Sequence, residues 1–218
     1  MASQEIHTSK RLQKYIAESI TNGAKLLPKS IRLGKSVIRR ESIACVGLLV
    51  HQQKIGAYYA PKPLPGNAAA FYVGNNNIPD GGNSIVISAQ AAKANPIEVR
   101  GALIHEAVHA VNDLIGRSIG ELEDEALAHV AESIYHISRN ARIQKEPYKT
   151  ARIAALEVLS DGKVSQAVYL ELKKVLHNGG KGYQKRFRHY DGVPGTTAET
   201  RKNFHREMKN STKHLGGK

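Results

Sequence analysis

The chain has 218 residues, of which 41% are hydrophobic, so it can bury a substantial core. Its single cysteine, Cys45, excludes an internal disulfide; it lies in an apolar run, where we expect a buried thiol. No apolar stretch is long enough to span a bilayer, and the polar segment Met1 to Lys14 lacks the apolar region of a signal peptide. We therefore expect a cytoplasmic protein, or one exported without a conventional signal peptide.

The net charge of +13 is distributed unevenly along the chain. Residues 1–40 carry nine Lys and Arg against two acids, and residues 179–218 carry ten against three, so each end has a net charge of +7. Residues 96–138 hold two basic side chains against eight acids, a net charge of −6. The acidic middle suits a cation. The basic ends suit nucleic acid or another anionic partner, or they are simply solvated termini.

The first 40 residues are predicted to form a basic N-terminal helical extension. Residues 9–21 place Leu12, Ile16 and Ile20 at helical spacing, and Asn22-Gly23 is expected to end that helix. Residues 24–40 are basic and interrupted by proline and glycine, which indicates a connector with a short helix or strand.

Residues 41–95 are predicted to contain several strands. The apolar run 43–50 has no helical period, so it is a buried strand or a short helix. Residues 54–60, 68–73 and 84–88 have the composition of strands, and the segments 61–66 and 74–83 are rich in Pro, Gly and Asn, as loops are.

A helix is predicted from Pro96 to Ile115. Asn95 is its N-cap, Pro96 takes the first helical position, Glu98 completes a capping box, and Gly116 is a natural stop. Gly101 is the one weak helix former; it marks close packing at that point or simply weakens the helix.

This helix contains the motif His-Glu-x-x-His, formed by His105, Glu106 and His109. Residues four apart lie on one face of a helix, so both histidines can bind one metal ion. Glu106 can reach a metal-bound water and act as its general base.

A second helix is predicted from Glu121 or Glu123 to Ser138. Its polar residues Glu125, His129, Glu132 and His136 follow at i, i+4, i+7 and i+11, a single face. For Glu132 and His136 we expect the solvated face of an amphipathic helix.

Two further helices, at 147–159 and 164–177, would form a helical subdomain. The tail, 179–218, is Gly-rich and basic, with a possible helix at 197–209. Its aromatics Tyr183, Phe187 and Tyr190 alternate with basic residues, a pattern that binds single-stranded nucleic acid or packs a tail onto its domain.

The motif helix and its neighbours, residues 84–138, resemble the zincin superfamily of zinc metallopeptidases, and within it the gluzincins. The resemblance implies an α+β fold: a short twisted sheet, then the active-site helix, then a helical subdomain. It implies bound Zn²⁺ and an edge strand, here residues 85–88, that pairs with an extended peptide substrate. An ordinary core strand is the alternative for these residues. An oxyanion-stabilising Tyr or His is also expected; the candidates are Tyr148, Tyr183, His189 and Tyr190. The extended metzincin motif is absent, because Asn112 and Ile115 occupy its glycine and third-histidine positions.

The gluzincin resemblance also implies a third zinc ligand on the next helix. Asp124 to Ala128 resembles the gluzincin pattern and makes Glu125 the expected ligand, with His129 as its second-shell brace. His129 shares the face of Glu125, however, and a site of three histidines stays open.

The prediction is therefore a zinc metallopeptidase with a catalytic domain at 41–178, flanked by 1–40 and 179–218. Glu106 is its general base, and His105, His109 and Glu125 are its metal ligands. The alternatives are a basic nucleic-acid- or partner-binding protein with a structural or vestigial metal site, and an intracellular effector toxin of protease type. The sequence does not predict the oligomeric state.

Overall fold

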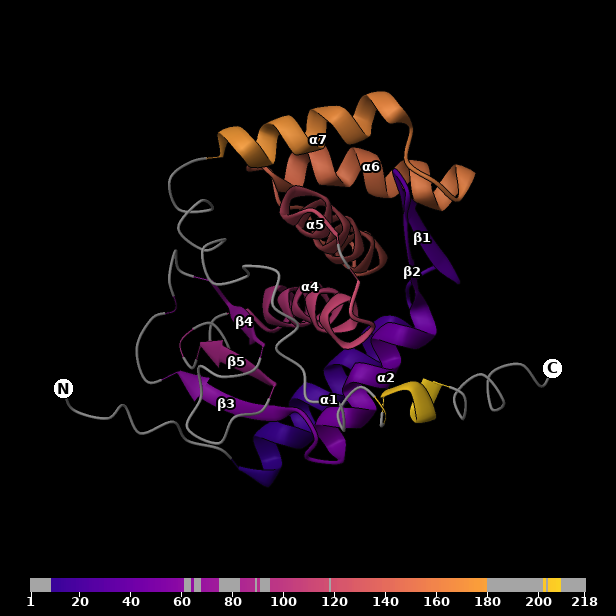
Figure 1. The fold of residues 1–218 in the computed structure, drawn as a ribbon. Helices are drawn as coiled ribbons and strands as arrows, with labels where there is room; N and C mark the ends of the chain where they lie inside the picture. Colours follow the sequence, from indigo (N-terminus) through magenta and orange to yellow (C-terminus); the bar gives the residue numbers. More distant parts are fainter. Residues whose placement is uncertain are drawn as a thin grey trace.

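The computed structural model describes residues 9–60, 64, 68–74, 83–88, 90, 95–117, 119–179, 202 and 204–208. In Figure 1, helix α4 (Pro96–Leu114) runs through the middle, between α5 (Glu121–Ser138) on one side and the pair α1 (Lys10–Ala24) and α2 (Arg40–His51) on the other. Helices α6 (Tyr148–Asp161) and α7 (Gln166–Asn178) pack on α5. A small sheet lies against α4, so the described residues have the predicted α+β character.

The N-terminal helix is longer than predicted. Ser9 caps α1 by accepting a hydrogen bond from the backbone N–H of Leu12. The predicted stop at Asn22-Gly23 is wrong, because the helix continues to Ala24. Gly23 lies inside the helix where space is short: a Cβ there would come within 2.7 Å of Cδ1 of Ile104 on α4. Close packing against α4 therefore explains this glycine.

The apolar run 43–50, left open between strand and helix, belongs to helix α2. Its buried side chains join those of α1 and of the later helices in one hydrophobic core. Residues 9–40 thus pack as part of the same body as residues 41–179.

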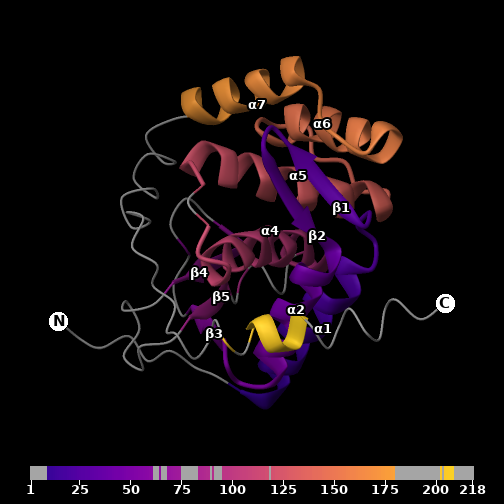
Figure 2. The ribbon, with the colours of Figure 1, turned by 45° about the vertical axis from the view of Figure 1, so that its right-hand side comes forward.

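The predicted connector 24–40 contains a hairpin. Strands β1 (Ser30–Leu33) and β2 (Ser36–Arg39) pair antiparallel, and Gly34 supplies the positive φ of +57° in the turn. Ser36 and Tyr169 both donate hydrogen bonds to the Glu123 carboxylate, which ties the hairpin to α5 and α7. Figure 2 shows the hairpin lying across the helical layers.

Strands β3 (Gly56–Ala60), β4 (Ala70–Val73) and β5 (Ser84–Ser88) form a three-stranded sheet in the order β3-β5-β4. Strand β5 pairs parallel with β3 and antiparallel with β4; Ile85 lies opposite Ala57 on one side and Tyr72 on the other. The three strands agree with the predicted ones.

The predicted role of residues 85–88 as an edge strand is wrong. Within the described part of the sheet, β5 is the central strand, and its backbone pairs on both sides. The edge nearest to α4 is β4 instead, and β4 packs directly on that helix.

The helix termini after the sheet largely follow the sequence. Asn95 Oδ1 accepts hydrogen bonds from the backbone N–H groups of Ile97 and Glu98 at the start of α4. Gly116 and Gly162 follow the ends of α4 and α6 with φ of +64° and +74°. The loops predicted at 61–66 and 74–83 lie mostly outside the described residues.

The described part of the tail is packed on the core. Lys202 and residues 204–208 are helical, within the predicted range 197–209, and Phe204 is only 1% exposed. The carbonyl oxygen of Phe204 lies 3.8 Å from Sγ of Cys45, which is buried as expected. Tyr183, Phe187, His189 and Tyr190 lie outside the described residues. None of the described helices combines the length and apolar character needed to cross a bilayer.

Candidate metal centre

Helices α4 and α5 approach each other closely at Gly101. A Cβ at this position would lie 2.2 Å from Nε2 of His136 on α5, so only glycine leaves room for that imidazole. This contact lies one turn before His105 on α4. Of the two interpretations of Gly101, close packing is the correct one, and it brings the two polar helix faces together.

The predicted ligands converge between these helices. Nε2 of His105 lies 3.5 Å from Oε2 of Glu125, and Nε2 of His109 lies 3.5 Å from Oε1 of the same carboxylate. One donor atom from each of His105, His109 and Glu125 falls within 4.8 Å of the others, so the three side chains could hold one ion. The structure thus places all three predicted ligands at one point.

Each motif histidine is also held from its other ring nitrogen. Nδ1 of His105 donates to Oε2 of Glu132 at 3.2 Å, and Nδ1 of His109 donates to Oδ2 of Asp124 at 2.8 Å. Asn112 in turn donates to Oδ1 of Asp124 at 2.6 Å. Ionised carboxylates only accept hydrogen bonds, so both imidazoles carry a proton on Nδ1 and direct Nε2 toward Glu125. Such carboxylate-histidine pairs typically orient metal ligands.

The prediction for Glu132 and His136 is wrong: their face of α5 is buried rather than solvated, and each is only 3% exposed. Glu132 contacts His105, and His136 packs on Gly101. The polar face of α5 has the pattern of a solvent-exposed face. In the structure it packs against polar residues of α4 instead. The sequence offered Asp124 as one of the candidates for the third ligand; the structure places it on Nδ1 of His109 instead.

The charges of the centre are strongly coupled. Burial disfavours a charged imidazole, but the carboxylates of Glu125 and Glu132 outweigh it and hold the pKa of His105 well above its usual value. Burial likewise opposes the charge on His109, yet Asp124 raises its pKa to about 9.

The pKa values of the carboxylates of Glu125 and Glu132 are shifted in the opposite direction. Burial by itself would raise the pKa values of Glu125 and Glu132, but the neighbouring histidines hold both below the ordinary value. At neutral pH the metal-free centre therefore keeps Glu125 and Glu132 ionised and gathers protons on His105 and His109. A divalent cation would compete with those protons.

Glu106 is fixed on the side of the sheet. Its Oε2 accepts a hydrogen bond of 2.7 Å from the backbone N–H of Tyr72 on edge strand β4. Glu106 is 7% exposed, and burial raises its pKa, against the opposing effect of His105 and His109. The carboxylate is therefore a stronger base than an exposed glutamate, and it adjoins both motif histidines.

His129 belongs to the same cluster. Its ring packs edge-to-face on His105 at 4.5 Å and on Tyr148 at 5.1 Å, measured between ring centroids. Of the four oxyanion candidates, only Tyr148 is described, and its ring contacts that of His129. Burial and the nearby His105 lower the pKa of His129.

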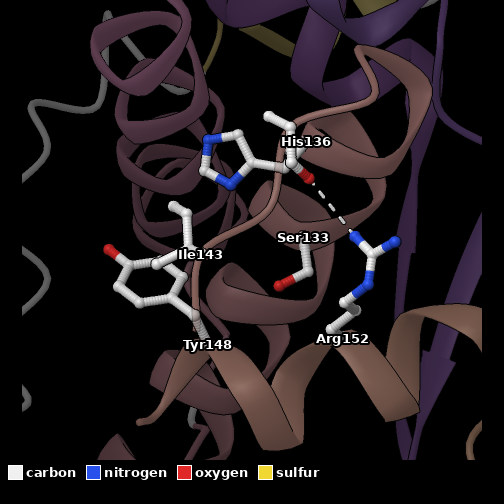
Figure 3. A pocket seen from close by; sticks show the side chains of 6 residues that line it. Ser133, His136, Ile143, Tyr148 and Arg152 are labelled. Atoms are coloured by element: carbon white, nitrogen blue, oxygen red, sulfur yellow. Dashed lines mark hydrogen bonds between the residues drawn. The ribbon is translucent and has the colours of Figure 1, made fainter. Parts of the chain in front are cut away.

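A separate hollow lies beyond Tyr148. It is lined by Ser133, His136, Ala141, Ile143, Tyr148 and Arg152. Figure 3 shows these side chains converging from α5, α6 and the segment between the two helices, with Arg152 donating a hydrogen bond to the carbonyl oxygen of Ala141 at 3.3 Å. Tyr148 thus lines this hollow and also contacts His129.

The donor set fits zinc. Imidazole nitrogen and carboxylate oxygen are common zinc ligands. Oε2 of Glu125 is buried and accepts no hydrogen bond among the described residues, although a buried carboxylate oxygen ordinarily has a partner. A cation between Glu125 and the two histidines would supply that partner.

Comparison with known proteins adds no family to this picture. No protein-family model, no curated protein and no solved structure matches the chain.

Proposed function

We propose that this chain is a zincin-type hydrolase that binds Zn²⁺ through His105, His109 and Glu125 and cleaves peptide bonds. One observation carries the proposal. The Nε2 atoms of both histidines face the Glu125 carboxylate, while Glu132 and Asp124 hold their Nδ1 atoms. A helical histidine pair with a purely structural role does not require carboxylates at both ring nitrogens.

Bound zinc would polarise the scissile carbonyl and lower the pKa of a bound water toward about 7. Glu106 then accepts the proton of the attacking water and passes it to the leaving amine. The raised pKa of Glu106 suits this role, because a base works best when its pKa approaches the working pH. The Tyr72 backbone N–H fixes the position of the carboxylate.

Strand β4 supports a peptide as the substrate. In the described sheet it is the edge strand nearest to Glu106, and an extended peptide can pair with the backbone of an edge strand. We therefore assign to β4 the substrate-pairing role that the sequence suggested for residues 85–88.

The test is the variant Glu106→Gln. Glutamine keeps the size of the side chain and can still accept from Tyr72, but it cannot take a proton from water. Zinc content should equal that of the wild type, whereas cleavage of a peptide library, or autolysis, should be lost. Wild-type turnover by this variant would show that Glu106 is not the general base.

A further inference from the structure

The hollow that Tyr148 lines has a buried side and a side that reaches solvent. Ser133 and His136, both on α5, are each only 3% exposed, whereas Tyr148 and Arg152 on α6 are half-buried. The space between these side chains measures about 10 Å³, which is enough for one water-sized group. A ligand can therefore place one small end group against Ser133 while the rest of it stays outside.

The hydroxyl of Ser133 is turned into this hollow. A serine inside a helix commonly donates to the carbonyl oxygen four residues earlier, as Ser138 on the same helix does to Ile134 at 2.9 Å. Ser133 makes neither that bond nor any other hydrogen bond to a described residue. Figure 3 shows its hydroxyl pointing toward the space between Tyr148 and Arg152. Since buried hydroxyl groups are ordinarily hydrogen-bonded, this one calls for a partner from outside the chain.

Arg152 supplies a positive charge at the same place. One of its N–H groups donates to the carbonyl oxygen of Ala141 at 3.3 Å, which holds the guanidinium at the rim. No described carboxylate forms an ion pair with it, and its other N–H groups make no hydrogen bond to a described residue. Burial, and to a smaller extent Arg152, lower the pKa of His136 against the opposing effect of Glu132 and Glu98, so His136 is neutral at pH 7. Arg152 is thus the cation among the lining residues.

These groups suit a carboxylate. A guanidinium binds a carboxylate or a phosphate through paired N–H donors, and the Ser133 hydroxyl can donate to the same anion. The space accepts one oxygen-sized group, which a planar carboxylate can insert, whereas a tetrahedral phosphate is too bulky. We propose that this hollow is a carboxylate-binding site, with Arg152 as its cation and Ser133 as its buried donor. The inference is independent of the proposed function, because none of the proposed metal ligands lines the hollow.

Titration of the full-length, metal-free protein with sodium acetate tests the proposal; metal is removed because acetate can also coordinate zinc. Backbone NMR signals around the hollow should shift in a saturable way. Ser133→Ala should weaken acetate binding about three- to tenfold without loss of stability, because this hydroxyl has no partner in the described structure. Arg152→Gln should weaken it about tenfold or more. The matched control is Arg142→Gln, because Arg142 is exposed, follows Ala141 and does not line the hollow; it should bind acetate as the wild type does.

Competition experiments define the ligand. Inorganic phosphate should compete poorly with acetate. Displacement by a short peptide with a free C-terminus would identify a chain end as the source of the carboxylate, and displacement by an amidated peptide with one Glu side chain would identify an acidic side chain. Acetate shifts that do not saturate, unchanged binding by folded Ser133→Ala, or phosphate binding as strong as that of acetate would overturn the proposal. Each of these results leaves the proposed function standing.

Discussion

Replacing Gly101 by alanine should destabilise the protein, although alanine is the better helix former. In an open helix, the exchange of glycine for alanine contributes about 1 kcal/mol of stability. Here the new Cβ would lie 2.2 Å from Nε2 of His136, a separation at which one of the two groups must move. His136 is 3% exposed, so its ring has little room to do so.

The size of the effect follows from these opposing terms. Overpacking of a core typically costs about 1–3 kcal/mol, and the severity of this contact places it at the upper end. The higher helix propensity of alanine offsets about 1 kcal/mol of this cost. Gly101→Ala should therefore lower the free energy of unfolding by about 2 kcal/mol. Urea denaturation of the metal-free protein, followed by circular dichroism, measures this value.

A double-mutant cycle isolates the cause. In a His136→Ala background the obstructing ring is gone, so Gly101→Ala should stabilise the protein by up to about 1 kcal/mol. The two substitutions should therefore be coupled by about 3 kcal/mol. Equal effects of Gly101→Ala in both backgrounds would refute the close approach of α4 and α5 at this point, and with it the geometry that brings the ligands together.

Three further predictions concern the charges of the metal centre, the carboxylate that holds His109, and the C-terminal tail. Because the pKa of His109 rises from 6.5 to about 9 on folding, its proton stabilises the metal-free protein below pH 6.5, and the free energy of unfolding should fall as the pH rises from 6.5 to 9; a flat or rising profile would contradict this. Glu125 and Glu132, whose pKa values are lowered, should impose a second loss as the pH falls below their ordinary value of 4.5. Asp124→Ala should weaken zinc binding about 10–100-fold by titration calorimetry, whereas Asp113→Ala, which removes the partner of the Tyr72 hydroxyl instead, should not. Phe204→Ala should cost about 3 kcal/mol in urea unfolding, against less than about 0.5 kcal/mol for the exposed Leu170→Ala; equal costs would show that the tail does not pack on the core.

The helices around the metal centre could be predicted from the sequence because capping residues mark their ends. Asn95 and Pro96 begin α4, and Gly116 and Gly162 end helices with positive φ. The motif histidines could also be placed, since helical spacing puts both on one face of α4, whereas Glu125 was named through the gluzincin resemblance.

What the sequence could not supply was the identity of the packing partners. Glu132 and His136 form a polar stripe whether the facing element is water or another polar helix, and only the approach of α4 at Gly101 separates the two cases. Strand order is likewise non-local: the composition of residues 84–88 does not reveal that strands pair on both sides. Gly23 appeared to be a helix stop because its contact with Ile104 is remote in the chain.

The central claim is that this chain holds a metal ion between α4 and α5, and elemental analysis measures that directly. Protein purified without added metal, then offered zinc and dialysed, should retain close to one zinc ion per chain. His105→Ala and His109→Ala, treated identically and shown to be folded by circular dichroism, should retain almost none. A wild-type stoichiometry near zero after zinc has been offered, or equal retention by the histidine variants, would contradict the account.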